Sequence, residues 1–175
     1  MHAETYQCLA ARTLIDEPDS VFTSNELAVM LDTLDLNAQS GKVAEYLKKG
    51  ICHRHGFDLE KLKDLLLDVS IAKQNVRYDD PIEDHLTGKA QMIIWCALGL
   101  IGESGEVADI VHYDQSTNNR NKLVKELGDC LWYIAALCTL IGVSLSDVME
   151  QNIAKLEQRY PNGYNSADSV KRVDV

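Results

Sequence analysis

The sequence predicts an all-α fold, a bundle of about six helices. Signals for helix starts and ends recur along the whole chain, and no segment alternates apolar and polar residues as a half-buried strand would. The chain has 175 residues, of which 46% are hydrophobic and 25% are charged, and only three are prolines. This length and composition suit one soluble globular domain, which we expect to span residues 1–175.

Local signals place the individual helices. Thr23-Ser24-Asn25-Glu26 and Ser144-Leu145-Ser146-Asp147 are typical of helix starts, and Gly142 is suited to ending the helix before the second of them. Gly56 followed by Asp58 marks another break. The sequence thus predicts helices near residues 3–15, 24–53, 58–77, 85–113, 119–141 and 144–160, followed by a polar tail over 165–175.

The first half of the chain resembles a degenerate copy of the second, with residues 1–80 corresponding to 81–164. Ser40–Glu45 parallels Ser104–Asp109, but Lys42 stands where the second half has Glu106, and Asp68 is the only acid retained. We predict that both halves fold into one bundle with a single competent site, toward which Lys42 is a candidate cation. A chance match remains the alternative, since the shared residue types are common in helices.

Two carboxylate pairs are the strongest functional signal. Residues three apart project from one face of a helix, so Glu103 lies beside Glu106, and Glu126 beside Asp129. If the two helices pack antiparallel, the four acids converge, and like charges about 4 Å apart repel by about 4 kcal/mol at a dielectric near 20. A cation must offset this repulsion, and oxygen ligands favour Mg²⁺ first and Mn²⁺ second. The alternative is that these acids line a solvated helix face.

Glycines accompany the acids at positions 99, 102, 105 and 128. Glycine weakens a helix but lets another backbone or a ligand come close. Their placement indicates that function outranks stability in this region.

The acidic segments resemble a known family. Gly99–Asp109 and Glu126–Tyr133 are similar to the acidic motifs of the MazG-like nucleoside triphosphate pyrophosphohydrolases, and Asn152–Tyr164 is similar to the helix end and turn that follow them. The resemblance covers residues 91–164. It implies an all-α enzyme that hydrolyses a nucleoside triphosphate to the monophosphate and pyrophosphate with Mg²⁺.

Carried over to this chain, the resemblance also assigns roles to residues. The metal ligands and catalytic residues would be four acids, one of them acting on the attacking water: Glu103, Glu106, Glu126 and Asp129. Lys155, Arg159 and Tyr160 become candidates for binding the phosphates of the substrate.

Helix geometry supports the phosphate-binding assignment independently. Asn152, Lys155 and Arg159 lie on one helical face, where two cations and an amide suit a polyanion. The alternative is a solvated face on the last predicted helix.

Charge and composition exclude several function classes. The formal net charge is −10, which opposes generic binding to nucleic acid. No Gly-x-x-x-x-Gly-Lys-Ser/Thr loop occurs, which disfavours a P-loop kinase or ATPase. The five cysteines include no Cys-x-x-Cys pair, which favours a reduced cytosolic setting. We find neither the pattern of a leader segment nor an apolar stretch long enough to span a membrane. We expect a cytoplasmic protein that does not contact a membrane.

Taken together, these features predict a Mg²⁺-dependent enzyme that removes nucleoside or deoxynucleoside triphosphates from the nucleotide pool. The alternative is a helical regulatory or nucleotide-sensing protein that keeps the MazG-like fold without catalysis. The expected partner is the triphosphate substrate. The chain would act either as a homodimer or as a monomer whose two halves form an internal pseudo-dimer.

Overall fold

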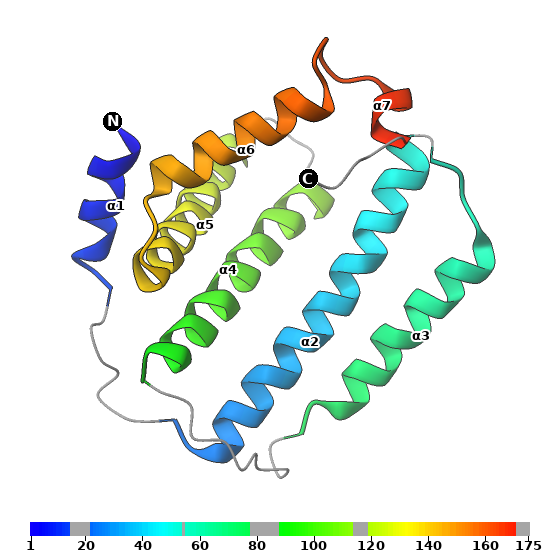
Figure 1. Ribbon diagram of the computed structural model, residues 1–175. Coiled ribbons are helices and arrows are strands. Elements are labelled where there is room, and N and C mark those ends of the chain that lie inside the picture. The colour runs from blue at the N-terminus through cyan, green and yellow to red at the C-terminus, as the bar shows by residue number, and fades with distance from the viewer. Residues whose placement is uncertain (15–21, 54, 78–87, 114–118, 171–175) are drawn as a thin grey trace. The chain divides into compact units, whose positions relative to one another are not determined.

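A computed structural model describes residues 1–14, 22–53, 55–77, 88–113 and 119–170 of the protein (Figure 1). In these ranges every regular element is a helix, apart from one isolated β-bridge between Pro161 and Gly163. The helices are α1 (Ala3–Ala11), α2 (Ser24–Leu47), the π-helix η1 (Lys48–Cys52), α3 (Leu59–Asn75), α4 (Gly88–Tyr113), α5 (Arg120–Ile141), α6 (Leu145–Arg159) and α7 (Ser166–Val170). The predicted all-α fold is confirmed.

The predicted helix ends are held by local hydrogen bonds. Before α2, the Thr23 amide donates to Glu26 Oε2 at 2.7 Å, and the Glu26 amide donates to Thr23 Oγ1 at 3.3 Å, which is a reciprocal capping box. Asp58 caps α3 by accepting from the amides of Glu60 and Lys61, the second and third residues of the helix. Gly142 ends α5 with a left-handed φ of 75°.

Two features of the helices were not predicted from the sequence. The end of the predicted helix 24–53 is the π-helix η1, and α7 lies within the predicted polar tail. The start of α7 is held by Asn165, whose side-chain oxygen accepts from the Asp168 amide at 2.8 Å.

The chain divides into two compact units, each built from two segments. The first unit comprises Met1–Leu31 with Tyr78–Ser146, and the second comprises Asp32–Arg77 with Asp147–Val175. The two units are described separately below. The single domain and the internal duplication expected from the sequence stay predictions.

The first unit is centred on α4 and α5, which pack antiparallel, with α1 packed on α5 (Figure 1). Gln7 of α1 fixes the turn after α5, because its amide group donates to Val143 O at 2.9 Å and accepts from the Leu145 amide at 2.7 Å. One buried cluster of this unit, where α1 packs on α5, comprises Ala10, Ala135, Cys138 and Leu145.

The second unit contains most of α2, followed by η1, α3, most of α6, and α7. The Tyr46 hydroxyl joins the end of α2 to the start of α3, since it accepts from the Asp58 amide at 2.7 Å and donates to Asp58 O at 3.0 Å. Ser169 of α7 is buried and lies between two imidazoles, with its Oγ 2.9 Å from His55 Nε2 and 3.2 Å from His53 Nδ1.

No single helix in the described ranges is both long enough and apolar enough to cross a membrane, although the consecutive helices α5 and α6 meet that test when they are counted together.

Candidate metal centre

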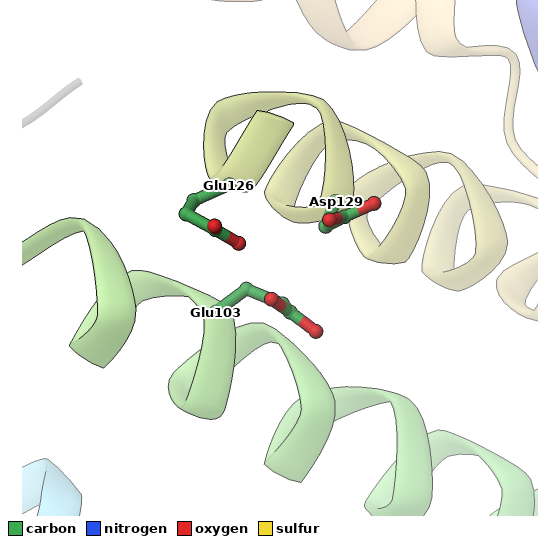
Figure 2. A group of neighbouring side chains, drawn as sticks. All are labelled: Glu103, Glu126 and Asp129. Carbon is green, nitrogen blue, oxygen red and sulfur yellow. The ribbon is translucent and has the colours of Figure 1, made fainter. Parts of the chain in front are cut away.

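Three of the four predicted acids converge between α4 and α5. Each of Glu103, Glu126 and Asp129 offers one carboxylate oxygen, and these oxygens all lie within 4.8 Å of one another. Figure 2 shows Glu103 reaching from α4 toward the two acids on α5. Glu103 and Glu126 are half-buried, whereas Asp129 is exposed. The group is therefore open to solvent on one side, as a site that admits a ligand must be.

The fourth predicted acid, Glu106, is exposed and does not join this group. It is nevertheless close enough for its charge to raise the pKa of Glu103. The assignment of Glu106 as a metal ligand stays a prediction.

A contact one helical turn from the acids sets the spacing of the two helices. Gly99 precedes Glu103 by four residues on α4, and Tyr133 follows Asp129 by four on α5. A Cβ atom added at Gly99 would lie 2.2 Å from Cε1 and Cζ of the Tyr133 ring, where no side chain fits. Glycine at this position therefore allows α4 and α5 to approach closely enough for their acids to meet.

The other three glycines serve no such contact within the described ranges. A Cβ atom at Gly102, Gly105 or Gly128 would meet nothing within 4 Å. These positions leave open space around the acids, so the close protein contact expected from the sequence is found at Gly99 alone.

Aromatic rings pack beside the Gly99 contact. The Trp132 and Tyr133 rings meet edge to face with centroids 4.8 Å apart, and Trp95 of α4 lies 6.2 Å from Trp132 and 6.0 Å from Tyr133. Trp132 Nε1 donates to Thr13 Oγ1 at 2.8 Å. Edge-to-face pairs of this kind contribute stability beyond their buried area, so they help to hold α4 and α5 in register.

The electrostatics of the group reflect concentrated negative charge. Burial raises the pKa of Glu103, and the charges of Glu106, Asp129 and Glu126 raise it further. Within the part of the chain that the structure describes, no Lys, Arg or His forms an ion pair with Glu103, Glu126 or Asp129. Like charges held together without a neutralising side chain favour a bound cation.

The donor set suits a hard divalent ion. Carboxylate oxygens are the ligands that Mg²⁺ and Mn²⁺ prefer, and neither a thiolate nor an imidazole belongs to the group. Glu103, Glu126 and Asp129 are the residues that could hold such an ion.

The predicted phosphate-binding residues lie in the second unit. Asn152, Lys155 and Arg159 lie on α6, and Tyr160 follows the helix directly. Lys155, Arg159 and Tyr160 are half-buried, and Asn152 is exposed. Because the acids belong to the first unit, the binding roles of these four residues stay predictions, as does that of Lys42.

Two tyrosines near the acids were not predicted as site residues. The Tyr6 hydroxyl donates to Gly128 O at 3.4 Å, and burial and the charge of Asp129 raise the Tyr6 pKa. Burial, followed by the charge of Glu103, raises the pKa of Tyr133. The four-residue spacing between Asp129 and Tyr133 was a usable signal for Tyr133, whereas nothing in the sequence connects Tyr6 with α5.

Comparisons with known proteins place the chain in a family. The family described as MazG nucleotide pyrophosphohydrolase domain matches residues 94–164, which contain all four predicted acids. Gene 37 protein of Mycobacterium phage L5 is 38% identical over 76 residues, which cover 39% of this chain and 67% of that protein. No solved structure matches the chain significantly. The family match and this relative, together with the all-α fold, show that the chain belongs to the MazG-like family.

Proposed function

We propose that the protein is a Mg²⁺-dependent nucleoside triphosphate pyrophosphohydrolase, in which Mn²⁺ can replace Mg²⁺. The observation that supports this function best is the meeting of Glu103, Glu126 and Asp129 within 4.8 Å of one another. Family membership supports the reaction type. The products would be a nucleoside or deoxynucleoside monophosphate and pyrophosphate, consistent with a role in clearing the nucleotide pool.

The reaction requires water to attack the α-phosphorus. The bond from that phosphorus to the α,β-bridging oxygen breaks, and pyrophosphate leaves with this oxygen. A divalent ion held by Glu103, Glu126 and Asp129 would screen the triphosphate and lower the pKa of a bound water. We assign to one carboxylate of this group the task of accepting the proton of the attacking water.

The side chains proposed for substrate binding are those predicted on and after α6. Arg159 suits a two-pronged contact with phosphate oxygens, and Lys155 suits a point-charge contact. Asn152 and Tyr160 add polar groups to the same segment. The substrate is the only partner that we propose, since a net charge of −10 opposes nucleic acid.

A pyrophosphate-release assay tests the function. The purified chain is incubated with Mg²⁺ and each common nucleoside and deoxynucleoside triphosphate, and we expect release from at least one of them. Glu126→Gln should lower the rate by at least about 100-fold, because the loss of an outer-shell partner alone costs about 10–100-fold. Glu150→Gln, at an exposed acid on α6 outside the group, is the matched control and should keep the full rate.

Other outcomes would contradict the proposal. Binding of a triphosphate that requires Mg²⁺ but gives no pyrophosphate would identify a nucleotide sensor. Neither binding nor release across the full set of triphosphates would identify a regulatory protein that keeps only the fold.

Light scattering tests the assembly separately. A particle of twice the chain mass would support the predicted homodimer, and one of 19.5 kDa would support the predicted internal pseudo-dimer.

A further inference from the structure

The second unit contains a cleft that the metal chemistry does not use. It consists of two hollows of about 460 Å³ and 520 Å³, which adjoin because both are lined by Tyr46, Lys49 and Lys61. Each volume falls within the range of small-molecule sites, about 300–1,000 Å³. We call this the lysine cleft. Its remaining lining residues are Ala38, Gly41, Lys42, Glu45, Gly50, His55, Gly56, Phe57, Asp58 and Leu65.

The walls of the lysine cleft are fixed by local structure. The Tyr46 hydroxyl is held at the start of α3 by its two hydrogen bonds to the Asp58 backbone. A Cβ atom at Gly50 would lie 3.1 Å from Gly56 O and 3.3 Å from Phe57 Cδ2, so the turn packs directly on η1. Gly56 has a φ of 92°, which the turn requires. A π-helix such as η1 is rare and is frequently found at functional sites.

The lysine cleft is positively charged in an acidic chain. Its lining carries Lys42, Lys49 and Lys61 against two acids, Glu45 and Asp58, although the whole chain has a net charge of −10. Lys48 and Lys49 share the single carboxylate of Glu45. Across the described ranges, no carboxylate pairs with the other two cations of the cleft, since Lys42 donates to the Gln39 amide oxygen and Lys61 lies over the Tyr46 ring. Excess cationic groups at a concave surface favour an anionic ligand.

An accessible aromatic ring stands beside these cations. Phe57 is 51% exposed, so its ring is open to solvent at the edge of the cleft. Its ring centroid lies 5.8 Å from that of Tyr46. A planar ring of a ligand could stack on the open face of Phe57 while its anionic part contacts Lys61.

The geometry points to a nucleoside phosphate as the ligand of the lysine cleft, bound without a divalent metal. Lys42, Lys49 and Lys61 would hold the phosphate oxygens, and Phe57 would support the base. In the cleft the lysines would neutralise the phosphates directly. At the acidic group of the first unit, a bound metal ion would have to do so. This inference goes beyond the proposed hydrolysis and does not depend on it.

The test measures ATP binding to the full chain by calorimetry in EDTA. Without a divalent ion, Glu103, Glu126 and Asp129 repel a triphosphate, so binding at the acidic group is suppressed, and the variants below assign the remaining signal to a site. We expect ATP to bind at least about tenfold more tightly than inorganic triphosphate, because base stacking contributes about 1.4 kcal/mol or more.

Matched variants locate the binding. Lys61→Gln should weaken ATP binding about tenfold. Lys63→Gln should not, because Lys63 lies outside the cleft and pairs with Glu60 at 2.8 Å. Phe57→Leu should lower ATP affinity to that of inorganic triphosphate. All three altered side chains are exposed, so circular dichroism should show unchanged helicity.

Three results would overturn the inference: no ATP binding in EDTA, equal binding of ATP and inorganic triphosphate, or equal effects of Lys61→Gln and Lys63→Gln. The pyrophosphate assay reports the metal centre independently, so failure of one proposal is distinguishable from failure of the other.

Discussion

Neutralising Glu103 should stabilise the metal-free protein and remove its response to Mg²⁺. Glu103→Gln keeps the size of the side chain but removes one of three like charges within 4.8 Å of one another. The same change deletes a ligand of the proposed ion. The carboxylate group therefore implies that the charge of Glu103 destabilises the metal-free protein but is needed for Mg²⁺ to bind.

The size of the effect follows from the spacing of the acids. At a separation of 4.8 Å, two unit charges repel by about 3.5 kcal/mol at a dielectric of 20 and by about 0.9 kcal/mol in water. The appropriate value lies toward the water limit, because Asp129 is exposed and the other two acids are half-buried. Removing the two repulsions that involve Glu103 should raise the free energy of unfolding by roughly 1–2 kcal/mol at low salt.

Thermal unfolding in EDTA and in excess Mg²⁺ provides the assay. In EDTA the melting temperature of Glu103→Gln should exceed that of the wild type by about 2–8 °C. Mg²⁺ at a hundred times its dissociation constant should stabilise the wild type by about 2.7 kcal/mol and the variant far less. Glu150→Gln should behave as the wild type in both conditions. A less stable Glu103→Gln protein in EDTA, or one with the full Mg²⁺ response, would refute the reasoning.

Three further predictions concern α4 and the thiols. Gly99→Ala places a methyl group against the Tyr133 ring and should lower the free energy of unfolding in urea by roughly 1–3 kcal/mol. Gly102→Ala, whose added methyl group meets open space, should raise that free energy by up to about 1 kcal/mol. Equal effects of the two variants would argue against the close approach of α4 and α5. Burial raises the pKa of Cys96 to about 11, so at a pH of about 8 a thiol-specific reagent should label the exposed Cys8 and leave Cys96 protonated and unlabelled until the protein unfolds. This folded-state pKa lies above the ordinary value of 9.0, so the contribution of Cys96 to the free energy of unfolding should fall as the pH rises from 9.0 toward about 11. Rapid labelling of Cys96 in the folded protein would contradict its burial. Glu106→Gln should weaken Mg²⁺ binding in calorimetry less than the loss of any acid of the group does, because Glu106 is exposed and lies outside it, and an equal loss would make Glu106 a ligand.

The helix ends were predictable because their hydrogen bonds span only a few residues. The capping box of Thr23 and Glu26 lies within four consecutive residues, and the left-handed end of α5 depends on Gly142 alone. The start of α7 uses the same kind of local bond at Asn165, but Ser169 then packs against His53 and His55, more than a hundred residues earlier. Such a contact has no periodic signature in the sequence.

The acid group was predictable for a similar reason, since a three-residue spacing fixes one helical face. The sequence does not show how closely α4 and α5 pack. That distance depends on the Tyr133 ring filling the space left by Gly99, a contact between residues on different helices. The absence of Glu106 from the group and the presence of Tyr6 beside Gly128 follow from the same tertiary packing. Spacing along one helix therefore predicted the candidate ligands, and packing between helices brings three of the four together.

An anomalous difference map from crystals grown with Mn²⁺ tests the central claim most directly. We predict one strong peak between α4 and α5, coordinated by oxygens of Glu103, Glu126 and Asp129, that disappears in Glu103→Gln crystals grown in the same way. Density elsewhere on the chain, with none between these three carboxylates, would contradict the proposed metal centre.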